Sequence, residues 1–299
     1  MLPRHRLWEA VKFDDRYFGI PWVMGTRALF YNKELFARAG LDSSKAPETW
    51  SEVLADSKKI HALGESTYGF GLQSGDRYKL FKKFMSLAWS SGGDILSPDQ
   101  KRVVFDSPQN LAALKFYLSL RPFALMDRQE TLDQGFKEGR IGMQISGAWL
   151  FKTIPHDAPA LRYGVGLVPA PPGGRHASFA GAEILASFKG SRHPREALML
   201  AQFLVAPENA AALCQAAKDV QPSAVGSEDS DYYRQRPMEQ LFVRQLETAV
   251  APPNISQWVD MEGAIEEALE EALHDKVTPE QALKNAQRKL EALLAAKGS

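Results

Sequence analysis

The stretch from Gly19 to Glu52 constrains the fold more than any other part of this chain. Two short apolar segments flank the break at residues 25–27 (Gly-Thr-Arg), and the second, residues 28–31, is typical of a buried strand. A short helix is expected over residues 33–39, and Gly40 stops it because glycine adopts the left-handed conformation of a helix C-cap at little cost. A strand followed at once by a helix, with a glycine break before it, predicts an α/β fold.

The rest of the chain continues this alternation. Three helix starts have capping signatures: Thr49 with Glu52, Ser107 with Pro108, and Thr278 with Pro279 and Gln281. Strands are expected over residues 68–72, 141–145, 163–169 and 179–188, the last of them broken by Gly181 and Glu183. Short strands alternating with helices, with no internal repeat, predict the α/β class and several points where the chain could cross between two lobes.

Composition and single residues exclude several functions. Lys plus Arg and Asp plus Glu both number 36, so there is no basic excess for a nucleic-acid partner. The lone cysteine, Cys214, lies in an apolar stretch and is expected to be buried rather than reactive. The six histidines are scattered without metal-ligand spacing, so no metal and no cofactor are predicted. Residues 1–6 are not followed by an apolar run, so no signal peptide or membrane anchor is predicted in this chain.

Tryptophans are the most informative candidate ligand contacts, because a flat ring covers the C–H face of a sugar while polar groups reach its hydroxyls. Trp149 follows a strand and Gly147, so its ring could project into a cleft or pack in the core. The same two alternatives stand for Trp22, Trp258 and Trp89, with packing favoured for Trp89. Trp50 belongs to a helix start and is structural, and Trp8 is assigned no role.

Four charged residues are candidates for binding hydroxyls. Arg27 lies in the first glycine break, and Glu183 follows Gly181 within an apolar strand. A buried carboxylate needs a partner, so Glu183 should meet a cation such as Arg27 or accept ligand hydroxyls, unless it forms a surface ion pair. Asp76 and Arg77 lie in a loop, either bonding a sugar or simply solvated.

Catalysis has little support. A glycosidase would need two carboxylates flanking one bond, and the sequence marks no such pair, although Glu183 with Asp76 stays open. No GxSxG elbow, GxxxxGK[ST] loop or GxGxxG turn after a strand is present.

Four segments occur in the order seen in a known family. They are residues 19–52, the run FKEGRIGMQISGAW (136–149), residues 181–194 and residues 252–283. The second closely resembles the segment "F..G..AM...G.W", in which the tryptophan stacks on a sugar. From Lys12 to about Leu290 the chain resembles the bacterial extracellular solute-binding proteins, the sugar-binding subunits of ABC importers, including maltose-binding protein.

The resemblance implies a two-lobe clamp of the periplasmic-binding-protein type (type II-like). Residues 1–25 would be the tail of lobe I, 26–180 lobe II, 181–234 the return to lobe I, and 235–299 the C-terminal helices of lobe II. Such chains carry further βα units before this point, so lobe I is expected to lack its front and to have an open edge. The protein is expected to be a monomer unless this open edge of lobe I pairs with another chain.

The resemblance also implies the function. The chain would be a binding protein and not an enzyme, capturing a mono- or oligosaccharide for a membrane permease in the periplasm or at the outer cell surface. Trp149, with Gly147 behind it, would stack on the sugar, with Trp22, Trp258 and possibly Trp89 as further walls. Arg27, Glu183, Asp76 and Arg77 would bond hydroxyls, with Gly181 at the crossing. A carbohydrate hydrolase using Glu183 and a protein-interaction module remain the alternatives.

Overall fold

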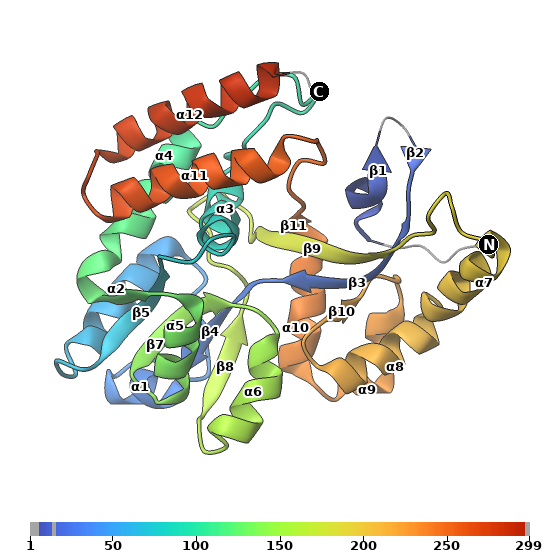
Figure 1. Ribbon diagram of the computed structural model, residues 1–299. Coiled ribbons are helices and arrows are strands. Elements are labelled where there is room, and N and C mark those ends of the chain that lie inside the picture. Colours follow the sequence, from blue (N-terminus) through green and yellow to red (C-terminus); the bar gives the residue numbers. More distant parts are fainter. Residues whose placement is uncertain (1–5, 14–15, 297–299) are drawn as a thin grey trace.

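The computed structural model describes residues 6–13 and 16–296, and two larger β-sheets organise this part of the chain (Figure 1). The five-stranded sheet has the order β6-β5-β7-β4-β8 and consists of β4 (Ala28–Asn32), β5 (Tyr68–Gln73), β6 (Ala124–Asp127), β7 (Ile141–Ser146) and β8 (Tyr163–Gly166). β5 is parallel to β6 and β7, whereas β4 is antiparallel to β7 and β8. All residues of β4 and β7 are buried, as expected for central strands covered on both faces.

Helices with clear local signals surround this sheet: α1 (Lys33–Arg38), α2 (Trp50–His61), α5 (Gln129–Lys137) and α6 (Trp149–Asp157). The capping box predicted for Thr49 and Glu52 is confirmed at the start of α2, and Gly40 has the predicted positive φ, 69°, just after α1. A short 3-10 helix, η2 (Arg121–Phe123), leads into β6.

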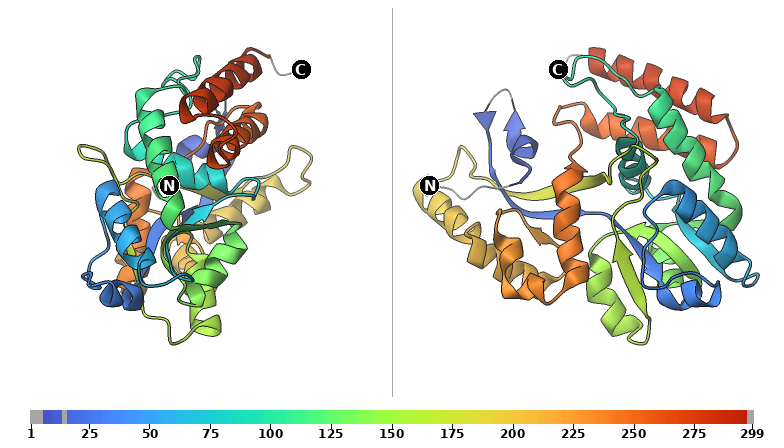
Figure 2. Two further views of the ribbon diagram at one scale, coloured as in Figure 1. Left: turned by 90° about the vertical axis from the view of Figure 1, so that its left-hand side faces the viewer. Right: turned by 180° about the vertical axis from the view of Figure 1, so that it is seen from behind.

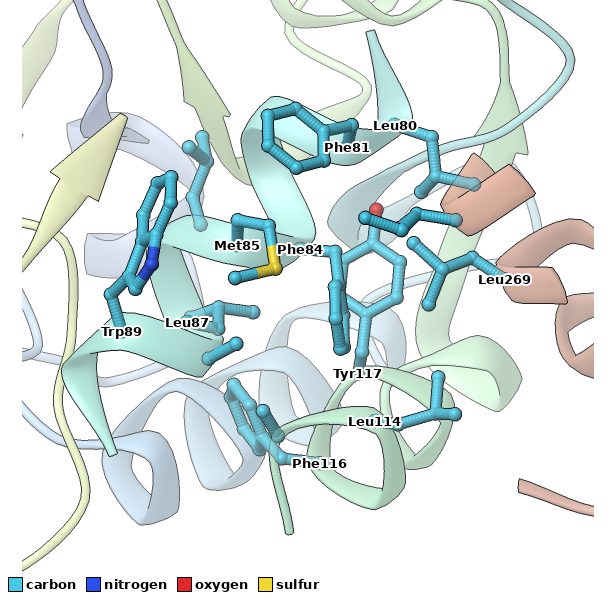
Figure 3. Close-up of a cluster of buried hydrophobic side chains, with 14 of the residues drawn as sticks. Leu80, Phe81, Phe84, Met85, Leu87, Trp89, Leu114, Phe116, Tyr117 and Leu269 are labelled. Carbon is cyan, nitrogen blue, oxygen red and sulfur yellow. The ribbon is translucent and has the colours of Figure 1, made fainter. Parts of the chain in front are cut away.

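A second group of helices shares a large hydrophobic core with the five-stranded sheet, and Figure 3 shows part of this core. It consists of α3 (Leu80–Ser90), α4 (Pro108–Ser119), α11 (Trp258–Leu273) and α12 (Pro279–Ala295). Trp89 is 2% exposed and belongs to this core with Phe81 and Phe84, which confirms the packing alternative. At the start of α12, Thr278 accepts from the Gln281 backbone, but the Gln281 side chain donates to Asn285 instead of completing the predicted capping box.

The four-stranded sheet has the order β10-β3-β9-β11 and extends away from the larger one (Figure 1). Its strands are β3 (Ile20–Thr26), β9 (Ser178–Leu185), β10 (Gln221–Pro222) and β11 (Ala249–Val250). Only Arg27 separates β3 from β4, so the chain passes between the sheets at this residue. The break predicted within the 179–188 strand was wrong for β9, which runs through Gly181 and Glu183; the irregularity lies in β3, where the register shifts between Pro21 and Val23.

Helices α7 (Pro194–Leu204), α8 (Pro207–Ala217), α9 (Asp231–Arg234) and α10 (Pro237–Gln245) accompany the smaller sheet, with 3-10 helices η3 (Ser227–Asp229) and η4 (Leu246–Thr248). Residues 227–236 are thus partly helical. Cys214 is buried as predicted, and burial raises the pKa of its thiol to about 12.

One face of the smaller sheet is open and apolar. No residue of α7 is buried, and Leu198, Met199, Leu200 and Phe203 are each more than half exposed. A hollow of about 730 Å³ lies between this helix and residues 17–20. Figure 2 shows α7 at the far end of the molecule from α12, near the hairpin of β1 (Lys12–Phe13) and β2 (Arg16–Tyr17), which the 3-10 helix η1 (Trp8–Val11) precedes.

Within residues 6–13 and 16–296, no single helix combines the length and apolarity of a membrane span, although α7 and α8 together do so across a 69° bend. The predicted lobe boundaries at 25/26 and 180/181 fall inside β3 and β9, and 234/235 falls at the end of α9. Part of the first predicted segment, residues 1–5 and 14–15, lies outside the described residues.

Candidate functional site

The candidate site lies where the parallel strands of the five-stranded sheet end. β5 and β7 finish at Gln73 and Ser146, and β4 begins at the same edge, because Ala28 pairs with Ser146. Arg27 therefore stands beside the segment that carries Trp149. In open α/β sheets, ligands bind at the carboxyl ends of the strands. We call the polar and aromatic side chains gathered here the junction cluster: Arg27, Lys83, Gln129, Asp133, Ser146 and Trp149.

The indole of Trp149 is placed by a glycine and a carboxylate. A Cβ atom added to Gly147 would lie 1.9 Å from the Trp149 ring, so only glycine lets the ring pack against this segment. Trp149 Nε1 donates to Asp133 Oδ2 over 2.7 Å, and the side chain is only partly buried. One part of the ring is thus fixed, while another part stays accessible.

Asp133 of α5 is the centre of the hydrogen-bond network. Its Oδ1 accepts from three neutral donors: Gln129 Nε2 at 2.8 Å, Gln144 Nε2 at 3.1 Å and Ser146 Oγ at 3.2 Å. Together with Trp149 these donors come from α5, β7 and the start of α6. The network therefore fixes the indole relative to the edge of the sheet.

Arg27 is 9% exposed, and its guanidinium lies over two rings, 4.8 Å from the centroid of Trp149 and 5.6 Å from that of Phe179. Its Nη1 donates to the Thr26 carbonyl over 2.8 Å. Burial lowers the Arg27 pKa to about 10, and Asp133 acts in the opposite direction. The guanidinium therefore stays charged at neutral pH.

Lysines of α3 and its N-cap surround the same rings. Lys83 is 4% exposed and donates from Nζ to Gln129 Oε1. Burial lowers the pKa of its ammonium to about 7. Lys79 Nζ lies 5.9 Å from the Trp149 centroid, and Lys82 Nζ lies 5.1 Å from that of Phe179.

Asp76 and Arg77, both predicted to bind ligand, make different contacts in the structure. Asp76 Oδ2 accepts from the Gln129 backbone at 2.7 Å and from Gln73 Nε2 at 3.2 Å, so it helps to hold the start of α5. Arg77 is exposed and lies over the Tyr78 ring. Both residues also line a hollow of about 680 Å³, and half of its other lining residues are acidic: Asp260, Glu266, Glu267 and Glu270.

Trp258 and Trp89 both contact Phe81, with ring centroids 5.0 Å and 6.1 Å away. Trp258 is partly exposed at the start of α11, while the buried Trp89 donates from Nε1 to the exposed Asp94. We therefore leave Trp89 out of the proposed site and keep Trp258 as a prediction, because Phe81 also packs on Phe179 beneath Arg27.

The three predicted residues of β3 and β9 lie further out along the smaller sheet. Gly181 packs against the Phe179 ring, with 3.3 Å between that ring and an added Cβ. Trp22 is partly buried, and within the described part of the chain its Nε1 is buried without a hydrogen-bond partner. Glu183 is exposed and lies opposite Val23 in the ladder, so it is not a buried partner of Arg27, and its contact with ligand hydroxyls stays a prediction.

Sequence reasoning missed Lys83, Gln129, Asp133 and Ser146. Lys83 did carry a signal, because it lies three residues after Leu80 and four before Leu87, on the apolar stripe of α3. A charged residue at such a position is unusual and indicates a buried partner or a site. Asp133 carried no comparable signal, because its importance depends on donors from three separate elements.

The cluster offers an aromatic face, a fixed carboxylate and two buried cations, which suits binding of a polar, ring-bearing ligand. Among residues 6–13 and 16–296, no group of three or more His, Cys, Asp or Glu side chains is placed to hold a metal ion.

Known proteins share this fold and this sequence pattern. The family model of bacterial extracellular solute-binding proteins matches residues 4–211. A protein of Brucella abortus described as a binding protein is 31% identical over 287 residues, which cover 94% of this chain and 69% of the relative. The chain therefore belongs to the bacterial extracellular solute-binding protein family, as its sequence motifs predicted.

Two further proteins are similar to this chain. The sn-glycerol-3-phosphate-binding periplasmic protein of Yersinia pseudotuberculosis is 24% identical over 296 residues, covering 93% of this chain and 67% of that protein. The crystal structure of an ABC transporter solute-binding protein from Thermotoga lettingae, bound with α-D-tagatose, matches with a TM-score of 0.85 and 27% identity. That match covers 97% of this chain and 75% of the other. The predicted two-lobe α/β fold is confirmed.

Proposed function

We propose that this chain is the substrate-binding component of an ABC importer and captures a mono- or oligosaccharide between its two lobes. Family membership and the relative bound to tagatose support this proposal. The two lobes would close about the crossing at Arg27, the single residue between β3 and β4, whose carbonyl accepts from Ser178 Oγ at the start of β9. Delivery would be to a membrane permease, in the periplasm or at the outer cell surface, as for the periplasmic relatives.

The observation that carries the proposal is the position of Trp149. Its partly accessible ring lies at the carboxyl edge of the sheet, held by Gly147 and Asp133. Sugar recognition needs such a rigid apolar surface beside hydrogen-bonding groups, and Arg27, Lys83 and Asp133 supply these. Trp22, Gly181 and Glu183 of the smaller sheet, and Trp258, would contact the ligand from the other side.

A hydrolase using Glu183 is a weaker alternative. Hydrolysis requires a second carboxylate close to the first, whereas the residue opposite Glu183 is Val23. The characterised relatives are binding proteins, which also favours binding without turnover. Turnover of a chromogenic glycoside that is lost in Glu183→Gln would support the hydrolase instead.

Thermal unfolding with a panel of neutral and charged sugars and polyols tests the proposed function. A ligand that binds only the folded state stabilises it by RT ln(1 + [L]/Kd), about 2.7 kcal/mol at a hundredfold excess over Kd. We expect a shift with particular ligands, strongly reduced in Trp149→Ala and partly retained in Trp149→Phe, which keeps a flat ring. If a cooperatively folded chain shows no shift with any of them, the proposal is wrong; a stable complex with a protein would then favour the interaction module.

A further inference from the structure

We infer that the ligand of the junction cluster carries an oxyanion group, a phosphate or a carboxylate, bound jointly by Arg27 and Lys83. The inference rests on the proposed function, since it names the chemical class of the solute captured at the same site. It narrows the ligand from a neutral sugar to a sugar or polyol that bears a negative charge.

Arg27 has more donors than acceptors around it. A guanidinium has five N–H donors, and the described residues provide one hydrogen bond for Arg27, from Nη1 to the Thr26 carbonyl. The side chain is nevertheless 9% exposed, so most of it is removed from water. The fork of unused donors has the geometry that binds the two oxygens of a carboxylate or phosphate.

Lys83 is a second buried cation, and it too has more hydrogen-bond donors than acceptors around it. Its ammonium has three donors, and the described residues provide one acceptor, Gln129 Oε1. Arg27 is close enough to act on the Lys83 charge and lower its pKa further. Two neighbouring cations that are both nearly removed from water need negative charge to compensate them.

The protein itself supplies too little of that charge. Asp133 is the carboxylate that acts on both cations, but it accepts its hydrogen bonds from Trp149, Gln129, Gln144 and Ser146 and, among the described residues, from neither Arg27 nor Lys83. The other nearby carboxylate, Asp76, accepts its hydrogen bonds from the Gln129 backbone and from Gln73 Nε2.

The nearby carboxylates of α11 already interact with other groups. Glu266 of α11 accepts from the backbone N–H groups of Tyr78 and Phe81 at the start of α3, and it acts with Glu262 on Lys82. The charged groups that act on Lys83 are Asp133 and Asp76, which are negative, and Arg27 and Lys79, which are positive. With Lys83 in its ammonium form, these five groups carry an excess of one positive charge. A neutral hydroxyl could accept one donor but would leave this charge uncompensated.

Binding of an oxyanion would also take up a proton. Lys83 faces Asp133 on α5, Arg27 at the crossing, Lys79 at the start of α3 and Asp76 in the β5–α3 loop. Its pKa of about 7 leaves it about half protonated at pH 7 and about one-hundredth protonated at pH 9. Only the ammonium form attracts an anion, so affinity should fall as the pH rises through this range, by up to about fifty-fold at pH 9.

The experiment is isothermal titration calorimetry with matched ligands on the intact chain. The panel comprises glucose, glucose 6-phosphate, glucuronic acid and sn-glycerol 3-phosphate, with inorganic phosphate as the minimal anion. The variants are Lys83→Met, Arg27→Lys and Arg27→Gln, with Lys59→Met on the exposed face of α2 as the matched control. Circular dichroism confirms that each variant unfolds cooperatively, and Arg27→Lys keeps the charge if Arg27→Gln does not fold.

We expect at least one charged ligand to bind at least tenfold more tightly than glucose, and comparison of the phosphates with glucuronic acid identifies the anion. Lys83→Met should weaken that ligand at least tenfold and remove the decline between pH 7 and pH 9, while Lys59→Met changes neither. Enthalpies measured in buffers of different ionisation heat should show about half a proton taken up at pH 7. If neutral sugars bind and the charged ligands do not, the oxyanion inference is wrong and the proposed function stands; if nothing binds, both are wrong.

Discussion

Burial of the Lys83 ammonium should make the stability of the ligand-free protein depend on pH in a way that one substitution removes. The folded-state pKa is about 7, against an ordinary value of 10.5. Below pH 7 the group is charged in both the folded and unfolded states, so the full cost of burying the charge is present. Between pH 7 and 10.5 the unfolded chain binds more protons than the folded one, so stability rises with pH.

The magnitude follows from the size of the shift. A difference of about 3.5 pKa units corresponds to an upper limit of about 5 kcal/mol, since each unit is worth about 1.4 kcal/mol. Between pH 7 and pH 9 the Lys83 contribution should change by about 2 kcal/mol, because the group is already half neutral at pH 7. Lys83→Met removes this term but leaves Gln129 Oε1 without its donor, which costs about 1–3 kcal/mol.

Urea denaturation at pH 7, 8 and 9 measures the effect. We expect the stability difference between Lys83→Met and the parent to fall by about 2 kcal/mol from pH 7 to pH 9, with the variant relatively more stable at the lower pH. Lys59→Met, which removes an exposed lysine, should leave the difference unchanged. Parallel pH profiles for Lys83→Met and the parent would refute the claim that Lys83 is buried with its charge.

Three further predictions concern other parts of the structure. Gly147→Ala should displace the Trp149 ring, which costs about 1–3 kcal/mol of stability and weakens ligand binding. Gly190→Ala is the control and should have neither effect, because a Cβ atom added there meets nothing within 4 Å. Unchanged tryptophan fluorescence and ligand affinity in Gly147→Ala would contradict the packing of the ring against Gly147. Thr49→Ala should lower stability by about 1 kcal/mol in urea denaturation through loss of the α2 capping box, and a change below a few tenths of a kcal/mol would show that the box contributes little. The chain should bind the apolar dye ANS in the hollow beside α7. Leu198→Glu or Leu200→Glu should reduce the dye fluorescence more than Met199→Glu, because the Met199 side chain does not line the hollow. Equal effects of the three substitutions would place the dye elsewhere.

Local signals in the sequence were sufficient for most elements. Caps at Thr49 and Ser107 and the positive-φ glycine Gly40 act within one helix turn, so they fix helix ends without tertiary information. The two-residue strands β10 and β11 were not predicted, because such short strands exist only through pairing with β3 and β9. The supposed break in β9 failed for a related reason: Gly181 and Glu183 lie in a ladder that β3 completes.

For the site, the sequence by itself determined the family, the α/β class and the position of Trp149 behind Gly147, because these follow from composition, spacing and motif order along the chain. Only the tertiary structure decided that Trp89 is core, that Glu183 is exposed, and that Lys83 and Asp133 join Arg27 and Trp149. The physical reason is that the charge state and desolvation of a side chain depend on neighbours brought by distant segments. Here α3, α5, α6 and the β3–β4 crossing meet at one edge of a sheet, and no local pattern encodes that meeting.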